Sequence, residues 1–229
     1  MSMTRARRPI PLALTALVAF VSALAALAVS NAQSAGAHGG PSHDHHAALT
    51  RKEAELHDGM RKLWEDHIVW TRLAIISLTT NAPDTEATVG RLLQNQTDIG
   101  NAVKPFYGEA AGNELTRQLR LHIQIAAEVI AAAQAGDQTK LADAQARWQS
   151  NADDIAGVLA SVNPRFWKLE TMKEEMHTHL QLTTEEVVAR LQANWDGDVA
   201  AYDRVHEHIL HMADLLSNGI VKQFPKRFH

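Results

Sequence analysis

Apolar side chains recur every three or four residues from position 50 to the end of the chain, with polar side chains between them. This is the period of a helix with one buried face, and no stretch shows the single-residue alternation of a strand. Capping residues, Pro and Gly divide the pattern into six helices. We expect these over residues 50–79, 84–103, 113–135, 138–162, 168–182 and 184–223, the last with a bend at 196–198.

The ends of these helices carry recognisable signals. Thr50 and Glu53 form a capping box, in which each side chain satisfies a backbone amide at the helix start. Pro105 stops the second helix, Gly136 the third and Pro164 the fourth. Because the connections are short, the pattern predicts an all-α fold, an antiparallel bundle of about six helices with a four-helix-bundle-like core.

The N-terminus follows a different pattern. Three arginines precede an 18-residue apolar run over residues 12–29, and small residues follow it. This predicts a signal peptide over residues 1–32, cleaved after Ala32 or else after Ala37. The alternative is an uncleaved membrane anchor, because the run nearly reaches the ~20 residues that span a bilayer. We expect an exported protein, either secreted, periplasmic or in the cell envelope, which meets the membrane only if this segment is retained.

Composition narrows the chemistry. The 229 residues include no Cys, which excludes disulfides, thiolate metal sites and thiol catalysis. The formal charge of −4, without a Lys/Arg stripe, argues against nucleic acid as a partner. The 13 His are the unusual feature. Any metal ion must therefore rest on His, Met, carboxylate or backbone.

A histidine-rich segment separates the leader from the helices. Residues 33–49 are rich in Gly, Ser, Ala and His and lack apolar periodicity, so they predict a flexible tail before a helical domain at 50–229. His43, His45 and His46 resemble the mobile arms that capture copper, zinc or nickel outside the cytoplasm. The alternative is a soluble spacer.

Four of the predicted helices each place a histidine on or beside the apolar face. Helical phase puts His67 in the middle of its stripe, with His122, His179 and His208 on or flanking theirs. Singly, each is typical of a core histidine bonded to a neighbouring carbonyl or carboxylate. If the first, third and last helices run parallel, three of these imidazoles reach similar heights and could bind copper or zinc.

Methionines accompany these histidines, and their soft sulfur favours copper over zinc. His211 follows His208 by three residues on the same face, a spacing that allows two ligands to one ion. The sequence thus predicts metal ions as partners, with copper or zinc as the cofactor. The candidate ligands are His67, His122, His179, His208, His211, Met212, Met60, His43, His45 and His46.

A second interpretation is a small-ligand or partner-binding sensor of the cell envelope. A polar run covers residues 95–101, where Gln96 lies on the apolar stripe and Gly100 permits close approach of another helix. The run is either a buried hydrogen-bond network or the wall of a small-molecule pocket shared with Asn151 and Tyr202. A third interpretation is a purely structural envelope protein.

No catalytic motif supports an enzyme. His206 and Glu207 begin like the HExxH of zinc proteases, but Leu210 stands where the second His is needed. Glu174 and His177 supply one of the two pairs of a di-iron bundle, and the first and third helices place no Glu inward. The absence of CxxCH excludes covalent haem, while a non-covalent haem held between two core histidines stays open. We expect a binding protein rather than an enzyme.

Four segments carry a family resemblance. They are LWEDHIVWTR at 63–72, NAVKPFYG at 101–108, NADDIA at 151–156 and GIVKQFP at 219–225. They resemble a functionally uncharacterised family of small, all-helical bacterial proteins over about residues 60–228. The resemblance implies a bacterial helical domain and transfers no catalytic residue.

Overall fold

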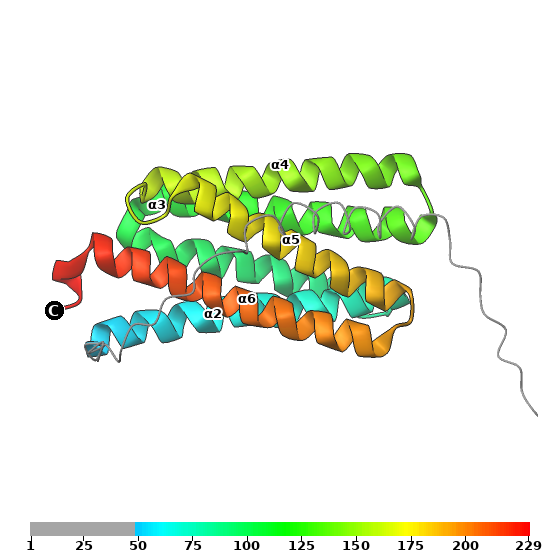
Figure 1. Ribbon diagram of the computed structural model, residues 1–229, viewed down its shortest axis with the longest axis horizontal. Helices are drawn as coiled ribbons and strands as arrows, with labels where there is room; N and C mark the ends of the chain where they lie inside the picture. The colour runs from blue at the N-terminus through cyan, green and yellow to red at the C-terminus, as the bar shows by residue number, and fades with distance from the viewer. Residues whose placement is uncertain (1–48) are drawn as a thin grey trace, which may run out of the picture.

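The computed structural model describes residues 49–229 and is helical in all of its regular structure (Figure 1). The prediction of an all-α fold is therefore confirmed for this part of the chain. The elements are α2 (Arg51–Thr80), α3 (Thr85–Ala135), α4 (Gln138–Val162), α5 (Leu169–Leu191), α6 (Trp195–Gln223) and the 3-10 turn η2 (Pro225–Arg227).

The first helix begins as its sequence predicts. The backbone N–H of Glu53 donates to Thr50 Oγ1 at 3.2 Å, and the Thr50 N–H donates to the Glu53 carboxylate at 2.7 Å. These two bonds satisfy amides that the first turn of a helix leaves without partners. At the other end, Asn81 adopts a left-handed conformation that closes α2.

Five α-helices stand among the described residues where six were predicted, because α3 contains two predicted segments. The chain folds back within α3 at Gly108, whose φ of 85° is non-helical. As a result Arg120 Nη1 donates to the carbonyl of Leu93 at 2.9 Å. A Cβ built on Gly100 would lie 2.6 Å from the carbonyl oxygen of Gly112, so the two halves touch through glycine backbone.

The boundary between the last two long helices differs from the prediction. The break expected before Thr184 lies instead at residues 192–194, where Ala193 has a φ of 55°. The hydroxyls of Thr183 and Thr184 donate to helix carbonyls four residues earlier, so these threonines continue the helix rather than cap a new one. The new helix is capped by Asn194, whose side chain accepts from the Gly197 N–H.

The helices pack in a ring around the core. α2 contacts α3 and α6, and α4 contacts α3 and α5, while α5 and α6 pack on each other and close the ring. α6 runs antiparallel to α2, because Thr50 bonds to Phe228 at one end and Arg72 bonds to Asp198 at the other. The assumption that the first and last helices run parallel is therefore wrong.

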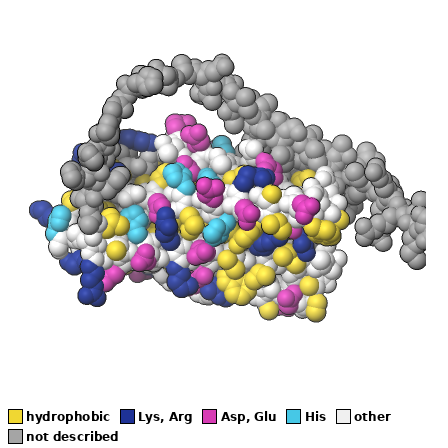
Figure 2. Space-filling view, turned by 60° about the horizontal axis from the view of Figure 1, so that its bottom comes forward, with side chains coloured by type: hydrophobic (Ala, Val, Ile, Leu, Met, Phe, Trp, Pro, Cys, Tyr) yellow, Lys and Arg dark blue, Asp and Glu magenta, His cyan; other side chains and the backbone are white. Residues whose placement is uncertain are grey.

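The described surface mixes charge signs. On the face shown in Figure 2, histidine, acidic and basic side chains alternate, and hydrophobic side chains gather at one end. Val69 and Leu73 of α2 and Trp195 and Val199 of α6 are exposed. No helix within residues 49–229 combines the length and the apolar character needed to cross a bilayer. The predicted leader and nearly all of the predicted tail, including His43, His45 and His46, lie outside the described residues.

Candidate functional site

Four histidines, one from each of four helices, meet inside the ring of helices. We call His67 (α2), His122 (α3), His179 (α5) and His208 (α6) the imidazole layer. The ring centre of His179 lies 5.8 Å from that of His67 and 6.1 Å from that of His122. It also lies 6.3 Å from that of His208. The first three are buried and His208 is partly buried, so the helical phase predicted their inward positions.

His122 has a partner for each ring nitrogen. Its Nδ1 donates to Asn151 Oδ1 at 2.8 Å, and its Nε2 accepts from the indole N–H of Trp148 at 3.1 Å. The Asn151 amide is oriented in turn by bonds from its Nδ2 to the carbonyl and side-chain oxygens of Gln118. Burial lowers the pKa of His122 to about 4, so the ring is neutral. His122 is held in place and has no lone pair left for an ion.

His67 is bonded at one nitrogen. Gln96 Nε2 approaches His67 Nδ1 at 3.1 Å and also donates to the Leu92 carbonyl, while Asn95 donates to the Leu63 carbonyl at 3.0 Å. Burial, and then repulsion from a second imidazole, lower the pKa of His67 to about 3. Gln96 Oε1 is buried without a partner among the described residues.

The polar run of α3 begins in a buried network, which is one of the two alternatives that its sequence allowed. Asn95 and Gln96 are completely buried and bond toward α2. Asn151 supports His122, whereas Tyr202 stacks on His206 and lies under Arg72. These side chains do not share one pocket.

His179 stands at the centre of the layer with an unsatisfied nitrogen. It is 4% exposed, and its Nδ1 has no hydrogen-bond partner among the described residues. Burial and the three neighbouring imidazoles hold its pKa well below the usual value. An unsatisfied buried nitrogen is uncommon, because it loses water without replacing it. Among the ring nitrogens of the layer, it is the one that is buried without a partner in the described residues.

His208 connects the layer to the surface. Its Nε2 lies 3.1 Å from the backbone oxygen of Glu175, and its Nδ1 lies 3.7 Å from the Glu175 carboxylate. The same carboxylate lies 3.4 Å from Nε2 of the exposed His211. His208 and His211 thus flank one acidic side chain, as their three-residue spacing allows.

Three buried methionines lie to one side of the layer. Met176 precedes His179 by three residues, Met212 follows His208 by four, and Met60 lies two turns before the layer histidine of α2. α2 and α5 both run antiparallel to α6. A methionine that precedes its histidine on α2 or α5 and one that follows its histidine on α6 therefore lie toward the same end of the protein. The sequence-predicted Met60 and Met212 therefore lie on a common side of the imidazoles.

The layer nitrogens do not converge on one point as they stand. Among residues 49–229, no three His, Asp or Glu side chains are grouped so as to hold an ion. The rings of His179 and His208 lie 18° from parallel, so they stack rather than direct nitrogens at a shared centre. Binding of an ion by the layer requires at least one ring to turn.

The sequence patterns missed one cluster of charged side chains in the interior. Arg72 bonds to both oxygens of Asp198 and to Glu186 at 2.6 Å, and Arg190 bonds to Asp198 at 3.1 Å. The four-residue spacing of Glu186 and Arg190 on one helix was an available signal. This charge cluster joins α2, α5 and α6.

No family model, no curated protein and no solved structure matches the chain. The resemblance to a family of bacterial helical proteins therefore stays a prediction.

Proposed function

We propose that the chain is an exported, antiparallel helical bundle that binds a transition metal ion, copper or zinc, in its imidazole layer. The observation that carries the proposal is His179, a central buried imidazole whose Nδ1 has no partner among the described residues. Rings from α2 and α6 lie beside it, with centres 5.8 and 6.3 Å away. An ion bound there would replace a missing hydrogen bond rather than break one.

The protonation state of the layer suits ligation. Imidazole binds metal only through a deprotonated nitrogen. Burial lowers the pKa of His67 to about 3 and that of His179 well below its usual value, so protons do not compete at neutral pH. For His67 to bind through Nε2, its proton moves to Nδ1. The Gln96 amide must then turn over, so that its unpartnered Oε1 accepts that proton while its Nε2 gives up the bonds that it donates to Leu92 and Asn95.

Copper is favoured over zinc by the surroundings of the layer. Met60, Met176 and Met212 are buried on one side of it, and thioether sulfur selects the soft Cu(I) ion. Within residues 49–229, Glu175 is the one carboxylate paired with a layer histidine, and it lies at the outer edge of the layer. A singly charged ion loses less hydration energy than a doubly charged one when it enters such a site.

The other predicted ligands receive different roles in this proposal. His122 supports the layer, because both of its nitrogens are already bonded. His211 stands at the entry beside Glu175. The tail residues His43, His45 and His46 capture ions weakly and deliver them. This division predicts one tight site in the helical part and several weak sites in the tail.

The test is a titration of the full chain with Cu(I) against a competing chelator, and with Zn²⁺ by calorimetry. His179→Leu fills the same space without a ligand atom and is expected to remove a one-to-one, sub-micromolar site. His177→Leu is the matched control, since that histidine lies on the same helix but faces Asp153 at the surface. Far-UV circular dichroism checks that each variant folds.

A second variant separates the tail from the layer. Replacing His43, His45 and His46 with Ser is expected to lower the number of weakly bound ions and to leave the tight site unchanged. A tight site that disappears with the tail histidines, or that survives His179→Leu in a folded protein, contradicts the proposal.

A further inference from the structure

Every methionine in residues 49–229 is buried in the same part of the core. One comes from α2, two come from α5 and one comes from α6. They are Met60, Met172, Met176 and Met212, each 2 or 3% exposed. All of them belong to the main cluster of buried apolar side chains. We call these residues the methionine cluster.

Two of the methionines share a helix face with a layer histidine. Met60 precedes His67 by seven residues, and Met172 precedes His179 by seven residues. Seven residues are nearly two helical turns, so each methionine leaves its helix on the same side as the imidazole. Both therefore face the interior of the ring of helices, displaced from the imidazole layer by about 10 Å along the helix axis.

Contacts between α2 and α6 show that Met60 and Met212 lie at a similar height in the bundle. Met60 is next to Arg61, whose guanidinium donates to the carboxylate of Asp214 at 2.7 Å. Met212 precedes Asp214 by two residues. A rise of 1.5 Å per residue places the two methionines within about one helical turn of each other along the bundle.

The methionines of α5 lie near the same height. Met172 and Met176 lie on either side of Glu175 in the sequence, and the Glu175 carboxylate lies 3.4 Å from Nε2 of His211. His211 directly precedes Met212. Because methionine is unbranched and has three rotatable bonds, its sulfur can reach across the remaining differences in height. Thioethers from three helices can therefore meet at one point.

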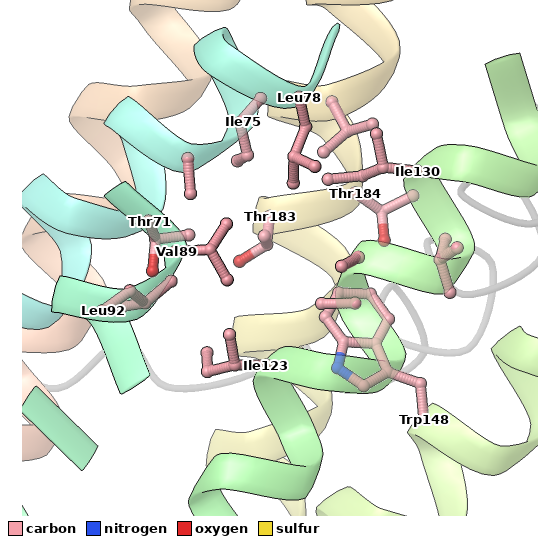
Figure 3. Close-up of a pocket in the computed structure, with 15 residues that line it drawn as sticks. Thr71, Ile75, Leu78, Val89, Leu92, Ile123, Ile130, Trp148, Thr183 and Thr184 are labelled. Carbon is pink, nitrogen blue, oxygen red and sulfur yellow. The ribbon is translucent and has the colours of Figure 1, made fainter. Parts of the chain in front are cut away.

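The distribution of methionine differs from the one that gap filling predicts, although methionine commonly fills irregular spaces in cores. A narrow apolar cavity of about 40 Å³ lies on the other side of the imidazole layer (Figure 3). Thr71 and Thr183, which line it, follow the layer histidines His67 and His179 by four residues. The other lining residues are aliphatic side chains, a third threonine and Trp148, with no methionine among them. The methionines are thus gathered away from a gap that they could fill, which favours a role for their sulfur.

One nitrogen donor lies beside the methionine cluster. His57 precedes Met60 by three residues on α2, and its side chain is 13% exposed. The Ser217 hydroxyl donates to the Ala213 carbonyl at 2.8 Å and accepts from His57 Nδ1 at 2.9 Å. His57 Nε2 therefore keeps its lone pair, and it is buried without a partner among the described residues. A partly exposed ring with such a nitrogen suits a metal ligand at the outer end of the cluster.

We propose that the methionine cluster binds one soft, singly charged metal ion, Cu(I) or its analogue Ag(I), through thioether sulfurs, with His57 Nε2 as a further ligand. Thioether sulfur is a soft ligand that favours Cu(I). These donors are all neutral, so a doubly charged ion would be left without compensating charge in the core. We expect a micromolar affinity, weaker than that of the imidazole layer. The site is separate from the layer and does not depend on metal binding there.

The test is methyl NMR of the full chain, labelled with ¹³C at the methionine ε-methyl groups and titrated with Ag(I) in chloride-free buffer. The signals of the methionine cluster are expected to shift together and to saturate at one ion per chain. Met3, which lies outside the described residues, reports binding outside the cluster and is expected to shift only at excess Ag(I). Zn²⁺ is expected to leave the cluster signals in place. Cluster signals that stay in place with Ag(I), or that move independently of one another, overturn the proposal.

A substitution removes one sulfur without changing the packing volume. Met212→Leu is close to isosteric, and we expect it to weaken Ag(I) binding at least tenfold. Ile209→Leu is the matched control, because this residue is buried on the same helix and carries no donor atom. If Met212→Leu does not fold, Met60→Leu takes its place. Equal Ag(I) affinity in the original chain and in a folded variant that lacks one sulfur overturns the proposal.

Two histidine variants define the limits of the site. His57→Leu is expected to weaken Ag(I) binding several-fold, whereas His177→Leu, at a part-exposed histidine beside Asp153, is expected to leave it unchanged. An unchanged affinity in His57→Leu overturns the assignment of that nitrogen as a ligand. His179→Leu is expected to keep the joint shift of the methionine signals. Loss of that shift in a folded His179→Leu variant overturns the separate site, whereas a failure of the imidazole layer to bind metal leaves the Ag(I) result intact.

Discussion

At the scale of single residues, the main feature is a set of imidazoles that burial keeps neutral. His122 is 3% exposed and accepts a hydrogen bond from Trp148 at one nitrogen while it donates to Asn151 at the other. A neutral ring fits this pair of partners, because a protonated ring could no longer accept from the indole N–H. Protonation of His122 therefore opposes the folded state in two ways, through lost hydration and through a lost bond.

This arrangement predicts acid lability. The pKa of His122 is about 4 in the folded protein and about 6.5 when the chain is unfolded. Below pH 6.5 the unfolded state binds the proton first, so the free energy of unfolding falls as the pH falls toward 4. His122 alone accounts for a loss of about 3 kcal/mol over that interval. Urea unfolding at several pH values between 7.5 and 4.5, with chelator present, measures it.

A variant isolates this contribution from those of the other buried histidines. His122→Gln does not titrate, so its unfolding free energy is expected to depend less steeply on pH, by about one proton between pH 6 and 5. His177→Leu, at a part-exposed histidine beside Asp153, serves as the control for removing a histidine from the surface. Identical pH slopes for the original chain and His122→Gln would show that His122 is not the titrating group.

At the scale of helices, local signals placed most boundaries. The capping box fixed the start of α2, and Gly136, in a left-handed conformation, ends α3 where it was predicted to end. α4 has the predicted bounds. The error at Thr183 and Thr184 arose because hydroxyl residues favour caps in general but can also bond back within a helix. Which of these a threonine does depends on burial, and both are buried.

The sequence predicted which face of its helix each candidate histidine lies on, but not whether the histidines lie at the same level along the bundle. The apolar stripe around each histidine revealed which way His67, His122 and His179 face, since phase is a local property. Whether they meet depends on how far each helix is shifted along its neighbour. That shift is set by contacts between distant residues, such as Arg72 with Asp198.

At the scale of the whole molecule, the charge cluster fixes the positions of three helices relative to one another. Arg72 of α2 reaches Glu186 of α5 and Asp198 of α6, and Arg190 supports Asp198. Both carboxylates are 1% exposed. Burial raises the pKa of Glu186 to about 7, whereas the arginines hold the pKa of Asp198 below its usual value despite its burial. Asp198 is thus the firmly ionised partner.

Removal of Arg72 is therefore expected to affect the whole fold. Arg72→Met keeps the length of the side chain but leaves the Asp198 charge buried with one arginine, a change that typically costs 3 to 5 kcal/mol of stability. Urea unfolding at pH 7.5 measures the loss. Arg51→Met removes an exposed pair with Glu55 and is expected to cost about 0.5 kcal/mol or less.

Adding Asp198→Asn to Arg72→Met is expected to restore part of the stability, because the uncompensated charge is then gone. If Arg72→Met and Arg51→Met are equally stable, the cluster does not hold α2, α5 and α6 in register. The alignment of the imidazole layer must then come from apolar packing and from the other hydrogen bonds between helices.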